Sequence, residues 1–226
     1  MKKLFCLVLS VMLLAVTLSA MAGTTDFSGE NFSIRNGLHY QMNKDDAIAT
    51  ETETQLAKAD IHPLWLMVHS DNEWDSYVGF DGVAVAGYGG GQLIMGFDKN
   101  NELKDITYLL GSMKESVFSD IESKLISKYG TPNCSNTALL ETEATRFSAY
   151  ENFTDTSLIA YDGWLLTYKD CYVKVELARR KSVINKTAFN PVFVGYRIIS
   201  LDEYNSTMEL VDSVNQYIQD SVDNDL

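Results

Sequence analysis

Strict alternation of apolar and polar residues recurs in short segments of this chain, and it constrains the fold more than any other feature. Between Cys171 and Leu177 every second residue is apolar, while Lys174 and Glu176 face the other way. Successive side chains of a β-strand lie on opposite faces, so a period of two predicts a strand with one buried face. Further strands are predicted over 62–69, 83–86, 92–97, 106–110, 164–168 and 192–198. Short turns separate most of these segments, which predicts antiparallel meanders.

A four-residue period marks the strongest helix signal. Apolar residues recur at this spacing from Met113 to Tyr129, which places them on one face of a helix. Ser112 and Glu115 have the spacing of a capping box at its start. Gly130 suits a left-handed cap at its end.

Two more helices follow from weaker signals. Asn43 is a favourable N-cap residue and Asp46 lies three positions later, so we expect a capped helix over 44–58. Apolar residues at helical spacing predict a C-terminal helix over 202–220.

The order of these elements predicts an α+β fold, with antiparallel meander sheets and packed helices. We expect one folded domain over 37–226, preceded by a flexible polar lead-in over 23–36. The order helix, meander, helix, meander also fits two tandem α-β units, 37–111 and 112–200. The two stretches share no convincing residue identity, so the repeat is a hypothesis.

The first 22 residues have the three parts of a secretory signal peptide. Lys2 and Lys3 precede an apolar run, and Ala20-Met21-Ala22 is a small-x-small cleavage site. No other segment approaches eighteen apolar residues, so we expect no membrane span in the mature chain. These features predict a bacterial protein that is secreted or periplasmic after cleavage.

The charge of the chain excludes one class of partner. Asp and Glu number 31 against 18 Lys and Arg, which gives a formal charge of −13. Removal of two lysines with the signal peptide makes it −15. Proteins that bind nucleic acids need clustered Lys and Arg, so we expect no nucleic-acid partner.

The cysteines and histidines give weak site candidates. Cleavage leaves Cys134 and Cys171, and in an exported protein two cysteines form a candidate disulfide. A buried thiol at Cys171 is the alternative. His69, Asp71 and Glu73 are metal-capable, but zinc needs at least three well-placed protein ligands, so we expect an acidic loop with neither metal nor cofactor.

Aromatic residues and glycines suggest a contact surface. Trp74 lies in the polar stretch 71–75, which predicts an exposed aromatic anchor for a partner. The same window contains Tyr77 and Tyr88. The glycine run after it, including Gly89 and Gly90, predicts a mobile hairpin loop that could cap a groove.

The stretch Phe32–Asp46, with its Arg35-Asn36-Gly37 and capped helix, resembles the opening of uncharacterised secreted proteins from Gram-positive gut bacteria. The Leu103–Tyr108 strand and Lys128–Pro132 resemble their next landmarks. The helix opening is also similar to that of β-lactamase-inhibitor proteins and of a small lipoprotein of outer-membrane assembly. That resemblance implies helices packed on an antiparallel sheet and a binding role. Gln41 and Ala47 replace the usual glycine and valine.

These observations predict an exported, non-catalytic binding or protein-interaction module. Its partner would be a protein or a small extracellular ligand. The alternative is a secreted hydrolase that uses a carboxylate pair or a metal site, because the abundant carboxylates neither identify nor exclude such a pair.

Overall fold

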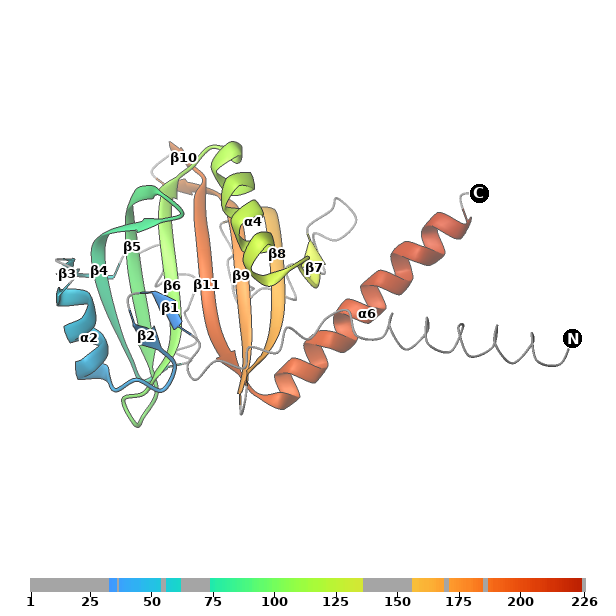
Figure 1. Cartoon of the computed structure of the whole chain (residues 1–226). Coiled ribbons are helices and arrows are strands. Elements are labelled where there is room, and N and C mark those ends of the chain that lie inside the picture. The colour runs from blue at the N-terminus through green and yellow to red at the C-terminus, as the bar shows by residue number, and fades with distance from the viewer. Residues whose placement is uncertain are drawn as a thin grey trace, which may run out of the picture.

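The computed structural model describes residues 33–35, 37–53, 56–61, 74–135, 156–168, 171–184 and 187–224. Within this part the chain forms three helices and a large antiparallel sheet, as expected of the α+β class (Figure 1). The helices are α2 (Lys44–Glu53), α4 (Glu115–Tyr129) and α6 (Leu201–Asn224). None of these helices is both long enough and apolar enough to cross a bilayer.

The large sheet has its strands in the order β3-β4-β5-β6-β11-β9-β8-β7. The strands of the first half are β3 (Ala57–Ala59), β4 (Ser76–Val85), β5 (Tyr88–Phe97) and β6 (Leu103–Ser112). Those of the second half are β7 (Cys134–Ser135), β8 (Thr156–Tyr168), β9 (Cys171–Ile184) and β11 (Pro191–Ile199). A short strand, β10 (Thr187–Phe189), pairs with β9, and β1 (Ser33–Arg35) pairs with β2 (Leu38–His39) in a separate ribbon.

The larger hydrophobic core lies on one face of the sheet, which we call the helix face. Helix α4 crosses this face over β8 and β9, and α2 lies near the β3–β4 edge (Figure 1). Apolar side chains from every second position of β4, β5, β6, β9 and β11 belong to one buried cluster with the buried residues of α4, namely Phe118, Ile121, Leu125 and Tyr129. The predicted period of two therefore builds this core.

Helix α4 confirms the predicted apolar stripe but not the capping box. Ser112 belongs to β6, where its hydroxyl accepts a hydrogen bond from the Asn190 amide at 3.1 Å. Lys114 is the N-cap residue and makes no side-chain cap. Gly130 ends the helix as predicted, but its φ of 83° and ψ of −169° are not those of a left-handed cap. Its carbonyl accepts a hydrogen bond from Trp164 Nε1 at 2.8 Å.

Helix α2 confirms the predicted cap but is shorter than expected. The Asn43 carboxamide accepts a hydrogen bond from the Asp45 amide at 3.0 Å, which is N-cap geometry. The helix ends at Glu53, and residues 57–59 form β3 at the edge of the sheet. Strand β1 also shows that ordered structure reaches back to Ser33, into the segment predicted to be a flexible lead-in.

The predicted glycine loop is a tight turn. Ala86 and Gly87 both have positive φ, 53° and 92°, which is the conformation of a two-residue hairpin turn that matches strand twist. Strand β5 begins immediately after it, at Tyr88. Strand β4 is irregular at Gly82, which has φ 86° and lies where the register with β5 shifts.

Charged residues are buried on the opposite face of the sheet. Lys174 and Glu176 do face away from the helix face, but each is at least 96% buried, whereas the sequence predicted exposure. Glu176 accepts a hydrogen bond from the Tyr161 hydroxyl at 2.7 Å, and Lys174 Nζ lies 3.9 Å from the same carboxylate oxygen. Part of this face is covered by the start of α6, where the Tyr204 ring lies 4.5 Å from that of Tyr172.

A glycine in β5 makes room for Trp74 on this face. A methyl group added at Gly96 would lie 2.5 Å from Trp74 Cδ1 and 3.0 Å from Tyr77 Cε1, closer than van der Waals contact. By contrast, nothing lies within 4 Å of the corresponding position at Gly111 in β6. The absence of a side chain at Gly96 therefore permits the indole to pack on the strand.

We predict that Gly96→Ala lowers the free energy of unfolding by about 1–3 kcal/mol, because the added methyl group overpacks this contact. Urea denaturation followed by circular dichroism measures the change. The matched control, Gly111→Ala, should stay within about 0.5 kcal/mol of the wild type. Equal effects of the two substitutions would contradict the packing of Trp74 on Gly96.

Candidate functional site

The residues predicted to form one contact surface lie in two separate places. Trp74 is half-buried against Gly96 rather than exposed, and its amide donates a hydrogen bond to the Tyr77 hydroxyl at 3.1 Å. Tyr88, Gly89 and Gly90 lie at the other end of β5. At about 3.3 Å per residue, Tyr88 and Gly96 are roughly 25 Å apart along the strand. The structure therefore does not bring Trp74 and the glycine run together.

The weak metal candidates His69, Asp71 and Glu73 lie outside the described residues. Among the residues that the structure does describe, no group of three or more His, Cys, Asp and Glu side chains could hold a metal ion.

The strand register separates the two cysteines. Cys134 in β7 pairs with Gly163 in β8, whereas Cys171 in β9 pairs with Tyr168. Gly163 and Tyr168 are five positions apart along β8, which is roughly 16 Å at the usual rise. Cα atoms joined by a disulfide are at most about 7 Å apart. The register therefore argues against the predicted Cys134–Cys171 disulfide.

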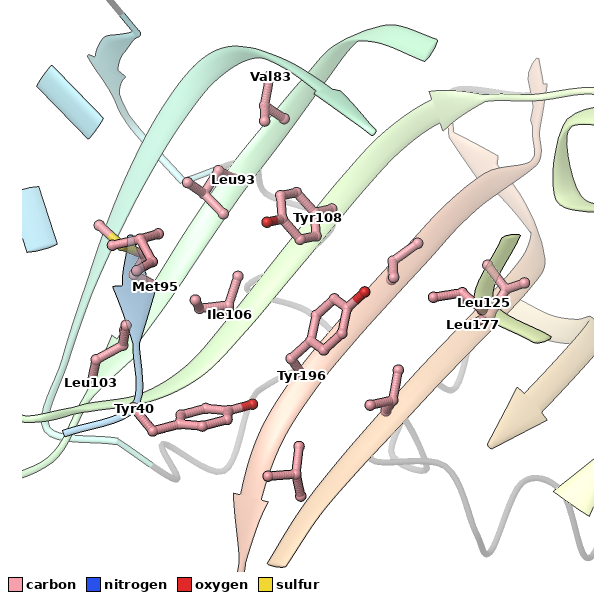
Figure 2. Packing of buried hydrophobic residues seen from close by; sticks show 14 of the residues in the cluster. Tyr40, Val83, Leu93, Met95, Leu103, Ile106, Tyr108, Leu125, Leu177 and Tyr196 are labelled. Atoms are coloured by element: carbon pink, nitrogen blue, oxygen red, sulfur yellow. The ribbon is translucent and has the colours of Figure 1, made fainter. Parts of the chain in front are cut away.

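A cavity of about 290 Å³ lies over the middle of the helix face. Its floor is formed by Tyr108 of β6 and Tyr196 of β11, which rise from adjacent strands (Figure 2). The remaining lining comes from β1 and from the end of β4 with its turn: Ile34, Arg35, Ala84, Val85 and Ala86. We call this space the Arg35 cavity. It brings together four segments that are separate in the sequence, namely β1, the end of β4 with its turn, β6 and β11.

Arg35 supplies the positive charge of the cavity. Its Nε lies 3.3 Å from Glu51 Oε1, and its guanidinium carbon lies 6.0 Å from the centre of the Tyr108 ring. Glu51 of α2 has no exposed side-chain surface, whereas Arg35 retains 19%. The buried carboxylate therefore holds a guanidinium that is still accessible from the cavity.

The tyrosines of the floor form a connected aromatic group. The Tyr108 and Tyr196 rings meet edge to face at 6.2 Å, and Tyr129 of α4 lies 6.4 Å from Tyr196. Burial raises the pKa of Tyr196 to about 12, with the Tyr129 hydroxyl acting in the opposite direction. Burial likewise raises the pKa of Tyr108 well above its usual range. These hydroxyls are therefore protonated at neutral pH and act as hydrogen-bond donors and acceptors, not as bases.

Helix α4 fixes the turn that forms one wall of the cavity. Lys124 Nζ donates a hydrogen bond to the Ala86 carbonyl at 2.7 Å and forms an ion pair with Asp120 at 2.6 Å. The same ammonium lies 5.7 Å from the centre of the Tyr88 ring. The predicted mobile loop is thus a turn tied to a helix, and Tyr88 stands beside the cavity wall.

A second group of polar side chains lies at the β7 end of the helix face. The Asp162 carboxylate is 3% exposed and accepts a hydrogen bond from the Ser135 hydroxyl. Burial raises the pKa of Asp162 to about 6, and the Glu122 carboxylate of α4 adds to the rise. A cavity of about 260 Å³ nearby is lined in part by Glu122 and Arg179, but not by Asp162.

Sequence reasoning missed the main residues of the Arg35 cavity. Arg35 lies in the segment 23–36 that the sequence predicts to be a flexible lead-in, and Tyr108 and Tyr196 lie within the strands predicted over 106–110 and 192–198. One signal was available, since a tyrosine on an apolar strand face needs a hydrogen-bond partner for its hydroxyl when buried. Glu51 gave no signal, because only the tertiary structure buries it.

We predict that Asp162 destabilises the fold as the pH rises. Its pKa is above the ordinary 3.8 in the folded state, so folding favours the protonated form, and stability falls as the pH rises from about 4 to above 6. Asp162→Asn should therefore gain about 1–2 kcal/mol relative to the wild type between pH 4.5 and pH 7.5. Urea denaturation at both pH values measures the gain.

The control for this experiment is Asp98→Asn. Hydrogen bonds from backbone amides and the ammonium of Lys104 outweigh burial and lower the pKa of Asp98. Because its pKa lies below that of Asp162, the difference between this variant and the wild type should change much less over the same range. A pH-independent effect of Asp162→Asn would show that Asp162 has no raised pKa.

Comparison with known proteins gives no relative from which a role could be carried over. No protein-family description, no curated protein and no solved structure matches the chain.

Proposed function

We propose that this chain is an exported, non-catalytic binding module and that its ligand occupies the Arg35 cavity. The observation that carries the proposal is the accessible guanidinium of Arg35, held by the buried Glu51 above two buried tyrosines. A concave site at which a few polar groups converge beside apolar residues is typical of ligand binding.

The chemistry of the cavity supports binding rather than catalysis. Among the described residues that line it there is no Ser, Cys, His, Asp or Glu. The tyrosine hydroxyls remain protonated at neutral pH, and Arg35 does not lose its proton in proteins. These groups can hold a ligand by hydrogen bonds and charge, but they offer neither a nucleophile nor a general base.

A secreted hydrolase remains the second candidate because of Asp162 and Glu122. A carboxyl group with a raised pKa beside another carboxylate is a feature of acid–base catalysts. However, Asp162 is almost completely buried and does not line the neighbouring cavity. A substrate would have to reach it through the contact between α4 and β8, so we favour the binding role.

We further propose that the domain consists of two tandem α-β units, α2-β3-β4-β5-β6 and α4-β7-β8-β9-β11. The strand order supports this proposal. If β3, β4, β5 and β6 correspond to β7, β8, β9 and β11, corresponding strands occur in the same order from the two edges of the sheet to its centre. A two-fold axis between Thr107 and Gly195, which pair with each other, relates the two ladders. The strand pairings define which positions this rotation exchanges. Three of the exchanged pairs are identical residues: Tyr77 and Tyr161, Gly79 and Gly163, and Tyr108 and Tyr196.

Export is also a proposal, and it predicts a defined N-terminus. In a bacterial host the secreted protein should begin at Gly23, as read by N-terminal sequencing or intact mass. Ala22→Phe should block cleavage, because the site requires a small residue there. Met21→Leu, at the unrestricted middle position, should be processed normally. Retention of residues 1–22 by the wild-type protein would contradict export by this route.

Binding at the Arg35 cavity can be tested with a panel of small probe molecules. We predict that a screen of uncharged and charged fragments by ¹H–¹⁵N correlation spectroscopy shifts the signals of Arg35, Ala84, Val85 and Ala86. Val85→Trp, which places an indole at the cavity wall, should abolish these shifts. Thermal denaturation checks that this variant folds. A screen in which no fragment shifts these signals would overturn the proposed function.

A further inference from the structure

We propose that the Arg35 cavity is selective for a monocarboxylate on a short apolar body. This inference rests on the proposed function and names the chemical class of its ligand. The charges of Arg35 and Glu51 support it, together with the shape and polarity of the cavity that Arg35 lines.

The geometry of Arg35 favours a planar oxyanion. Glu51 lies on the Nε side of the guanidinium, at 3.3 Å. Arg35 lines the cavity and 19% of its side chain is exposed, so a ligand there can reach guanidinium donors that Glu51 does not hold. A guanidinium presents its N–H donors as a rigid fork that matches the two oxygens of a carboxylate.

The buried carboxylate of Glu51 argues against a dianion. Glu51 has no exposed side-chain surface and lies beside Arg35, which is the only cationic side chain among the described residues that line the cavity. A phosphate monoester would bring close to two negative charges beside the Glu51 carboxylate, and like charges are disfavoured at low dielectric. A carboxylate brings only one.

A neutral ligand is disfavoured because it cannot form charge-assisted hydrogen bonds with Arg35. Hydrogen bonds from a guanidinium to a charged acceptor are about twice as strong as those between neutral groups. The Tyr196 hydroxyl, at the base of the cavity, is protonated at neutral pH and can donate to the same oxyanion. An amide of the same shape would lose the charge-assisted part of these bonds.

The remaining lining residues limit the rest of the ligand. Ile34, Ala84, Val85 and Ala86 carry no charged or hydrogen-bonding side chain. Its volume of about 290 Å³ lies at the lower limit of ordinary small-molecule sites. This space suits a single ring or a short branched chain attached to the carboxylate. A free acid and the carboxyl terminus of a peptide both offer this chemistry.

The test uses benzoate, its neutral isostere benzamide and the dianion phenyl phosphate, each titrated into the purified protein at pH 7.5. Dissociation constants come from chemical shifts of the Arg35 side chain and of the Ala86 amide. We expect benzoate to bind at least 10-fold more tightly than benzamide and than phenyl phosphate. Equal binding of benzoate and benzamide would overturn the inference while leaving the binding module intact. No shift with any of the three, and none in the fragment screen, would overturn the proposed function itself.

Three variants test whether Arg35 is responsible for the binding of benzoate. Arg35→Lys keeps the charge but loses the fork, and we expect at least 10-fold weaker binding of benzoate. Loss of Arg35 alone could unfold the protein by leaving Glu51 without its guanidinium. The double variant Arg35→Gln/Glu51→Gln therefore removes both charges. It should also lose the preference for benzoate over benzamide. Lys104→Gln, in an ion pair with Asp98 and Glu102 outside the cavity, should bind benzoate as the wild type does. Unchanged benzoate binding by Arg35→Lys or by the double variant would overturn the inference.

A further arm distinguishes the two sources of carboxylate. The peptide Gly-Gly-Phe with a free carboxyl terminus is compared with its C-terminal amide and with 3-phenylpropanoate, which carries the same ring. Tighter binding of the free peptide than of 3-phenylpropanoate would support a peptide terminus as the natural ligand. The reverse order would support a free acid. Equal binding of the peptide and its amide, together with no preference for 3-phenylpropanoate over its amide, would contradict carboxylate recognition altogether.

Discussion

The antiparallel pairing of β6 with β11 is the constraint on which the rest of this structure depends. It joins two meanders that are otherwise separate along the chain into one continuous sheet. Seven residue pairs make up this ladder, from Pro191–Ser112 to Arg197–Asp105. Without it, each half would be a small sheet with an unpaired central edge, and such edges promote association with other chains.

The same pairing places Tyr108 and Tyr196 on one face and within ring contact. Neither strand alone could form the floor of the Arg35 cavity. The walls then depend on two further long-range arrangements: the β1–β2 ribbon brings Arg35 over Tyr108, and α4 holds the turn at Ala86 through Lys124. The candidate site is thus a product of tertiary structure at the middle of the sheet.

The Arg35–Glu51 pair explains why a cavity persists there instead of a closed core. Removing a buried carboxylate's partner is strongly destabilising, commonly by about 3–5 kcal/mol, so the pair keeps β1 attached to α2. At the same time, a guanidinium with 19% of its surface exposed cannot be covered by apolar side chains without loss of hydration. The sheet face therefore stays open between the β1–β2 ribbon and α4.

Much of the framework could be predicted from the sequence because periodicity reports directly on burial. The alternation in β5, β6, β9 and β11 and the four-residue spacing in α4 identified these elements and their buried faces. Local patterns failed where long-range contacts decide the outcome. Lys174 and Glu176 have the pattern of exposed residues but are buried, and Trp74 sits in a polar stretch but packs on Gly96. Arg35 lay in a short polar segment without periodicity, so nothing local indicated that it borders a cavity.

The most direct measurement of the central claim is a crystal structure of the protein grown with benzoate. We predict electron density for benzoate in the Arg35 cavity, with a carboxylate oxygen about 2.7–2.9 Å from a terminal nitrogen of Arg35. We also predict that its ring lies against Ile34 and the 84–86 wall. Density for benzoate at another place, with the Arg35 cavity filled by side chains of the protein, would contradict the account.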